Sequence, residues 1–174
     1  MTETIKLMKA HTSVRRFKEQ EIPQADLEEI LTAGQMASSW KNFQSYSVIL
    51  VRSQEKKDAL YELVPQEAIR QSAAFLLFVG DLNRAEKGAS LHTDTFQPHG
   101  VEGLLITSVD AALAGQNTLL ARRVWDMVVL SSVWSVISQK KWQRFLTCLT
   151  IPTLFLGLPL ACQINNTRSN QDCL

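Results

Sequence analysis

VEGLLITSVDAALAGQNTLLA, residues 101–121, has the composition of one long helix in this chain of 174 residues. Alanine and leucine dominate it, and small residues cluster at Ala111, Ala112, Ala114 and Gly115. A helix with so few charges is expected to be buried on most sides, or to pack at a subunit interface.

Shorter elements precede it. YSVILV at Tyr46–Val51 and FLLFV at Phe75–Val79 are apolar and β-branched or aromatic, which predicts two buried strands. Pro23 suits the first position of a helix. Helices are predicted over residues 2–10, 23–37, 54–63 and 66–72, and an exposed excursion containing His92, Phe96 and His99 over residues 83–100. Helices that alternate with strands predict a layered α/β or α+β domain.

The composition narrows the class of protein. A content of 45% hydrophobic and 20% charged residues suits one globular domain with a sizeable core. The net charge of +1 gives no reason to expect nucleic acid as a partner. The chain shows no basic-then-apolar leader, so we expect a cytoplasmic protein that does not bind membranes. The three cysteines have no metal-ligand spacing, and no metal site is predicted.

Three segments carry a resemblance. They are HTSVRRF at residues 11–17, MASSWKNFQSYSVILV at 36–51 and SVDAALAGQNTLLA at 108–121. In this order and spacing they resemble the nitroreductase superfamily, and within it the branch of NADPH-dependent, oxygen-insensitive flavin reductases and nitroreductases. The resemblance covers nearly all of residues 1–121. It implies an α+β fold with an α/β/α layered arrangement.

The resemblance also implies a cofactor site. FMN would bind at a homodimer interface to which both subunits contribute, and NADPH would be the co-substrate. The loop with His11, Thr12, Ser13 and Arg15 would hold the flavin phosphate, since a phosphate is bound well by a guanidinium fork and hydroxyl donors. Thr12 departs from the arginine usual in the family, which removes one cation.

The remaining implied cofactor residues lie later in the chain. Ser38, Ser39 and Gln44 would approach the flavin ring and ribityl chain, and Gln66 takes the place of a family glutamine near the flavin. Without the resemblance, the same serines could simply close a helix, and Gln44 could be an ordinary surface residue. No catalytic side chain is predicted, because the cofactor carries the chemistry.

The composition changes at about Ala121. Residues 1–121 carry 12 Lys+Arg and 15 Asp+Glu, whereas residues 122–174 carry 6 Lys+Arg and 2 Asp and have no Glu. All three cysteines and three of the four tryptophans fall in the second part. The sequence that the resemblance predicts after QNTLLA is roughly AESLGYGG, but the sequence of this chain there is RRVWDMVVLSSVW.

A shifted reading frame permits the expected sequence. The last base of the Trp125 codon and the first two of Asp126 form GGA, which is glycine. Asp126 into Met127 then gives tyrosine or histidine, and Met127 into Val128 gives glycine again. We therefore predict that residues 122–174 are an out-of-frame translation of a nitroreductase C-terminal region, and that the C-terminal part of the sheet is missing or non-native.

Two other interpretations of residues 122–174 stay open at this point. The segment could be a genuine divergent tail, or Phe145–Cys162 could be a membrane segment, although Pro152 and Pro159 weaken that reading. The functional prediction has two branches as well. One is an FMN-dependent oxidoreductase that uses NAD(P)H to reduce nitroaromatics, quinones or free flavin. The other is a truncated, catalytically inactive nitroreductase fragment.

Overall fold

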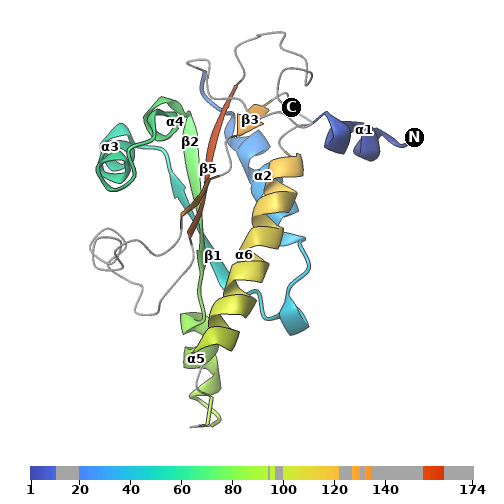
Figure 1. Cartoon of the computed structure of the whole chain (residues 1–174), viewed down its shortest axis with the longest axis vertical. Helices are drawn as coiled ribbons and strands as arrows, with labels where there is room; N and C mark the ends of the chain where they lie inside the picture. Colours follow the sequence, from blue (N-terminus) through green and yellow to red (C-terminus); the bar gives the residue numbers. More distant parts are fainter. Residues whose placement is uncertain are drawn as a thin grey trace.

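The computed structural model describes residues 1–10, 20–93, 95–96 and 100–121, and the backbone of residues 127–129, 132–134 and 155–162. Figure 1 shows helices on both sides of a narrow sheet within these ranges. In chain order the elements are α1 (Glu3–Lys9), α2 (Gln24–Gln35), the 3-10 helix η1 (Trp40–Asn42), β1 (Tyr46–Val51), α3 (Gln54–Leu63), α4 (Glu67–Gln71), β2 (Ala74–Gly80), α5 (Asn83–Ala89), α6 (Val101–Ala121), β3 (Met127–Val129), β4 (Ser132–Trp134) and β5 (Phe155–Cys162).

Strand β2 lies at the centre of the sheet. It pairs antiparallel with β1 on one side, where Tyr46 faces Gly80 and Val51 faces Phe75. On its other side it pairs antiparallel with β5, and β3 and β4 both pair with β5. All residues of β2 are buried, as its apolar sequence predicts for a strand covered on both faces.

The alternation of side chains along β2 divides the core into two layers. Leu76 and Phe78 pack with the residues of α2 and α6, whereas Phe75 and Leu77 pack with those of α3 and α4. Figure 1 shows these two helix pairs on opposite sides of the sheet. The predicted α/β/α layered α+β fold is confirmed for the described residues.

Helices α2 and α6 approach each other through small residues. Gly34 is buried in α2, and a Cβ atom at this position would collide with the Thr118 hydroxyl of α6. Asn117 Nδ2 also donates to the Ala33 carbonyl at 3.3 Å. The helix face predicted for α2 is confirmed, since Leu27, Ile30 and Gly34 are buried. Pro23 is the N-cap residue rather than the first helical residue, so α2 begins one position later than predicted, at Gln24.

Of the two alternatives expected for residues 101–121, burial on most sides is wrong for the single chain, and packing at a subunit interface stays a prediction. One face of α6 packs on α2 and β2, but Val101 is 83% exposed, Leu105 62% and Val109 47%. These residues lie four positions apart and form one exposed apolar stripe on the helix. By length and composition α6 could also cross a membrane, as long core helices of layered domains often could.

Two other expectations need adjustment. The excursion at residues 83–100 is not loop throughout, because it begins with helix α5, which has no buried residue. The segment after Ala121 does contribute backbone to the sheet, through β3, β4 and β5. Residues 155–162, the last eight of the apolar segment considered as a membrane span, are strand rather than helix.

Candidate functional site

The segment from η1 to the start of β1, residues 40–45, has an unusual backbone. Lys41, Asn42 and Gln44 have φ values of 48°, 57° and 50°. These values are in the left-handed region, where asparagine is tolerated but lysine and glutamine are rarely found. Three non-glycine residues in this region so close together need strong local support, and such strained backbone clusters at binding sites.

A buried carboxylate supplies much of that support. Asp110, in the middle of α6, is 1% exposed. Its Oδ1 accepts a hydrogen bond from the Trp40 amide and its Oδ2 from the Ser45 amide, both at 3.0 Å. The two amides flank the left-handed residues. Because the acceptor is ionised, these bonds are stronger than bonds between neutral groups.

The other side of the loop is held from the start of α5. Arg84 Nη2 donates to the Gln44 carbonyl at 2.9 Å, and the Gln44 amide donates to Ser39 Oγ at 3.2 Å. Asp81 donates its amide to the Ser45 carbonyl at 2.9 Å. The loop therefore has hydrogen-bonded partners on α6, at the end of β2 and on α5.

Tyr46 interacts electrostatically with both Asp110 and Arg84. Burial raises the pKa of its phenol above the ordinary value, and the nearby Asp110 carboxylate raises it further. The Arg84 guanidinium acts in the opposite direction and lowers the pKa. The phenol therefore stays protonated at neutral pH and reports on the charge of both groups.

Aromatic residues cover the outer side of the loop. The rings of Trp40 and Phe43 meet edge to face with centroids 5.6 Å apart, and Phe43 lies 6.1 Å from Phe96 of the excursion. Lys41 Nζ sits 4.7 Å from the centre of the Trp40 ring. The contact with Phe96 joins the excursion to the predicted flavin loop.

The predicted cofactor residues fall into three groups. His11, Thr12, Ser13 and Arg15 lie outside the described residues. Ser38, Ser39 and Gln44 lie together before β1, with Ser38 and Gln44 exposed and Ser39 half-buried. Gln66 is half-buried at the N-cap of α4.

The structure does not bring Gln66 together with the other group. Gln44 precedes Tyr46 at one end of the β1–β2 pair, whereas α4 enters β2 at the opposite end, where Phe75 faces Val51. A strand of this length spans roughly 20 Å. Figure 1 shows α4 and the start of β1 at opposite ends of the sheet. One chain alone therefore does not form a single site from both groups.

A buried lysine orders the region next to Gln66. Lys57 of α3 is 6% exposed, and its Nζ donates to the carbonyls of Ser72 at 2.7 Å and Arg70 at 3.4 Å. Burial lowers the pKa of this ammonium below its ordinary value, although the neighbouring Asp58 opposes the shift. Lys57 thus fixes the end of α4 against the start of β2.

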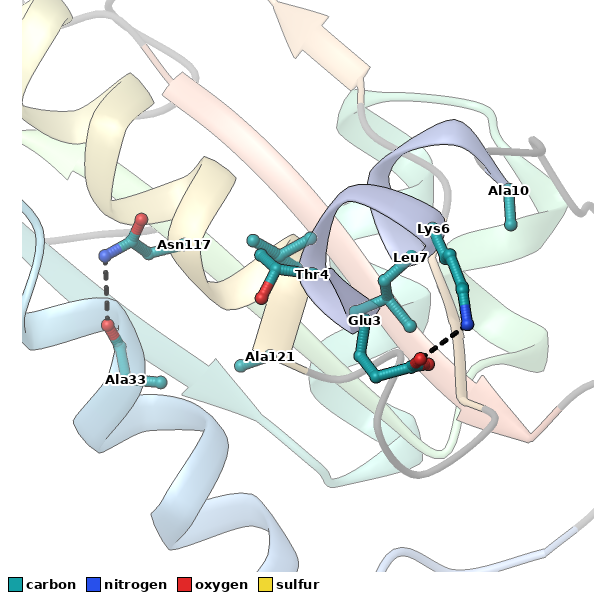
Figure 2. A pocket seen from close by; sticks show the side chains of 9 residues that line it. Glu3, Thr4, Lys6, Leu7, Ala10, Ala33, Asn117 and Ala121 are labelled. Atoms are coloured by element: carbon teal, nitrogen blue, oxygen red, sulfur yellow. Dashed lines mark hydrogen bonds and ion pairs between the residues drawn. The ribbon is translucent and has the colours of Figure 1, made fainter. Parts of the chain in front are cut away.

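A cavity of about 760 Å³ opens between α1 and the last turns of α6. Figure 2 shows Leu7, Ala33 and Ala121 on its walls, with the ion pair of Lys6 and Glu3 at its rim. Ala10, directly before the predicted phosphate loop, also lines it. None of the described candidate cofactor residues does, so we do not assign the flavin ring to this cavity.

The described residues fit a flavin at the loop before β1. An isoalloxazine ring carries carbonyl acceptors and a ring N–H, and the ribityl chain carries hydroxyls. The exposed Ser38 hydroxyl and Gln44 amide can both donate and accept. The Ser45 hydroxyl is 1% exposed and has no hydrogen-bond partner within the described part of the chain, so this region holds an unsatisfied polar group.

Sequence reasoning missed the residues that support the loop, Asp110 and Arg84. A signal for Asp110 was present, since it is the only acidic residue in the interior of the apolar stretch 101–121. An ionised side chain at such a position is seldom buried without a partner. Nothing in the sequence distinguishes Arg84 from other cations of the excursion.

Comparison with known proteins identifies the family. Residues 8–127 match the nitroreductase family. The chain belongs to this family. An NADPH-dependent oxidoreductase of Staphylococcus saprophyticus is 34% identical over 159 residues, covering 88% of this chain and 63% of the relative. An FMN reductase [NAD(P)H] of Bacillus subtilis is 37% identical over 117 residues, covering 66% of this chain and 47% of the relative. The chain thus spans about half to two thirds of the length of these relatives.

Solved structures share the fold. The structure of B. megaterium NfrA2 superposes with a TM-score of 0.88 at 25% identity, covering 97% of this chain and 70% of that chain. The NADPH:FMN oxidoreductase of Vibrio harveyi, solved with NAD⁺, gives a TM-score of 0.82 at 25% identity, covering 97% and 72%.

Proposed function

We propose that this chain is an FMN-dependent oxidoreductase that takes reducing equivalents from NAD(P)H. The observation that carries the proposal is the left-handed loop before β1, which presents Ser38 and Gln44 to solvent on a backbone fixed by Asp110 and Arg84. The similarity to an FMN reductase of Bacillus subtilis and to an NADPH:FMN oxidoreductase of Vibrio harveyi supports it.

In the proposed reaction, bound FMN supplies the chemistry of accepting and donating a hydride. The side chains of this chain bind and orient it. Ser38, Ser39 and Gln44 hydrogen-bond the ring and ribityl chain, while His11, Thr12, Ser13 and Arg15 hold the phosphate. The acceptors we propose are nitroaromatics, quinones or free flavin.

We further propose that the site is completed by a second copy of the chain, and that the protein works in the cytoplasm. The positions of Gln66 and Gln44 at opposite ends of the β1–β2 pair support a second copy, because two copies can bring opposite ends of their sheets together. The exposed stripe of Val101, Leu105 and Val109 on α6 supports an interface, since apolar patches of this kind are usually covered in an assembly.

The second candidate is an inactive fragment whose residues 122–174 are translated out of frame. Two observations favour it. The family match ends at residue 127, close to the change in composition. Pro159 also lies in β5 opposite Phe75, between β2 and β3, although proline cannot donate to the strand ladder and is rare in central strands. The alignment with the Staphylococcus saprophyticus relative weighs against it, since it covers 88% of this chain and therefore extends beyond residue 121.

One set of samples distinguishes the two candidates. The purified chain is incubated with FMN, desalted, and measured for flavin absorbance and for NADPH oxidation with a quinone acceptor. An FMN oxidoreductase retains the flavin and turns over, whereas a chain that retains none and is inactive supports the fragment. Sequencing the gene across the codons for residues 117–126 then shows whether one nucleotide restores the family text.

The variant Gln44→Gly tests the loop itself. It removes the amide side chain, and glycine adopts a φ of 50° without strain, so lost binding cannot be assigned to a strained backbone. We expect the Kd for FMN to rise at least tenfold. Gln35→Ala, which removes an exposed glutamine from the end of α2, is the matched control and should leave the Kd unchanged. Equal affinities for the parent and Gln44→Gly would refute the assignment of Gln44.

A further inference from the structure

The conformation of residues 40–45 is not one that their own sequence favours. Lys41 and Gln44 adopt left-handed backbone angles without the freedom of glycine, and Asn42 lies between them in the same region. Such a segment relaxes to ordinary angles unless its surroundings hold it. The contacts that hold it therefore determine how Ser39 and Gln44 are presented.

Asp110 is placed to do this. Each of its carboxylate oxygens binds one amide, and the two amides, of Trp40 and Ser45, stand on either side of the left-handed residues. The separation between the oxygens of one carboxylate thus sets the separation between the ends of the segment. Ser45 is 1% exposed, so its amide would be buried without a partner if the oxygen were lost.

We propose that Asp110 is the positioning residue of the cofactor loop, and that its carboxylate holds residues 40–45 in the left-handed form that flavin binding requires. Only the second part of this proposal, that flavin binding requires the left-handed form, rests on the proposed function. Asp110 does not itself face the ligand, since it is almost fully buried and both of its oxygens are engaged by backbone amides.

The variant Asp110→Asn isolates the effect of the second oxygen. Asparagine keeps the shape of the side chain but has one acceptor oxygen, and its NH₂ group would face an amide N–H instead of accepting from it. One end of the segment is then released. The matched control is Thr118→Val, which removes another buried hydrogen bond from the same helix, the one to the Ala114 carbonyl, without touching the loop.

Two readouts separate the parts of the proposal. In the full chain labelled with 5-fluorotryptophan, the ¹⁹F resonance of Trp40, assigned with Trp40→Phe, reports the loop in the absence of flavin. Asp110→Asn should shift or broaden this resonance, and Thr118→Val should not. Titration with FMN should show at least a tenfold rise in Kd for Asp110→Asn and less than a twofold change for Thr118→Val.

A rescue variant tests the mechanism. Lys41→Gly removes the strain at one left-handed position, because glycine adopts φ 48° freely. Added to Asp110→Asn, it should recover at least part of the lost FMN affinity and return the Trp40 resonance to that of Lys41→Gly alone. If neither the FMN affinity nor the Trp40 resonance recovers, a role of Asp110 through loop conformation is contradicted.

The remaining outcomes are decisive in different ways. An unchanged Trp40 resonance in Asp110→Asn would overturn the proposal, whatever the flavin does. Equal losses of FMN affinity in Asp110→Asn and Thr118→Val would also overturn it, since the effect would then be a general loosening of α6. A parent chain that binds no FMN would refute the proposed function, while the Trp40 resonance would still decide whether Asp110 holds the loop.

Discussion

Replacing Gly34 with alanine should destabilise the fold, although alanine is the better helix former. Gly34 lies inside α2, and its backbone is helical, so alanine would normally add about 1 kcal/mol of stability. Here the new Cβ atom would overlap the Thr118 hydroxyl, which is fully buried and donates to the Ala114 carbonyl at 2.9 Å.

The magnitude follows from what must move. If Thr118 rotates away, its buried hydroxyl loses its acceptor, which costs about 1–3 kcal/mol. If instead α2 moves off α6, overpacking costs about 1–3 kcal/mol as well. After the gain in helix propensity is subtracted, we expect a net loss of up to about 2 kcal/mol, which lowers Tm by about 2–4 °C for each kcal/mol in a chain of this size.

Urea denaturation followed by circular dichroism measures this loss. The double variant Gly34→Ala/Thr118→Ala removes the clash, so the two substitutions should be non-additive, with a coupling energy of about 1 kcal/mol or more in the favourable direction. A Gly34→Ala chain as stable as the parent, or additive effects in the cycle, would refute the close contact between α2 and α6.

Three further predictions concern the charged groups. The pKa of Tyr46 is raised by burial and by Asp110 and lowered by Arg84. In a Tyr61→Phe background, Asp110→Asn should therefore lower the pKa of Tyr46 measured by phenolate absorbance, and Arg84→Gln should raise it. An unchanged pKa in both variants would contradict the electrostatic effect of Asp110 and Arg84 on Tyr46. Burial lowers the pKa of Lys57, so the unfolded chain holds more protons between that depressed pKa and about 10.4, and the free energy of unfolding should rise with pH across this window. Lys57→Met should abolish that rise. Parallel curves of unfolding free energy against pH for parent and variant would disprove that Lys57 causes it. Arg70 and Asp58 form an ion pair at 2.7 Å with both side chains over a third exposed, so Asp58→Asn should cost little stability at neutral pH, and the cost should shrink further at high salt in the same urea titration.

Most of the described elements before residue 121 could be predicted from local patterns. The bounds of β1, α3 and α6 agree with the prediction, because a β-branched run, a helical spacing and an Ala/Leu-rich stretch are each properties of neighbouring residues. Helix α5 was not predicted, since its sequence NRAEKGA has no apolar face and its stability comes from its context. The exposure of one face of α6 was not predicted, because the sequence pattern of a single chain does not show which parts of a helix are covered by neighbouring elements.

The candidate site was predictable only in the residues that we propose to contact the flavin. Ser39 and Gln44 were found through the resemblance, but Asp110 lies 65 positions beyond Ser45, the residue whose amide it binds. Contacts over such separations follow from the packing of α6 against the sheet rather than from local sequence. The separation of Gln66 from Gln44 likewise depends on the antiparallel pairing of β1 with β2.

The position of β2 between an early and a late strand has a consequence for protein synthesis. Its partner β1 is complete before β2 leaves the ribosome, but its other edge waits until β5 begins at Phe155. Throughout that interval β2, whose residues are all buried in the folded chain, presents free amides and carbonyls to its surroundings, which is a template for pairing with other nascent chains. A change in the codons of β5 should therefore reduce how much protein a cell accumulates and increase its dependence on chaperones, before it alters the turnover of the molecules that do fold.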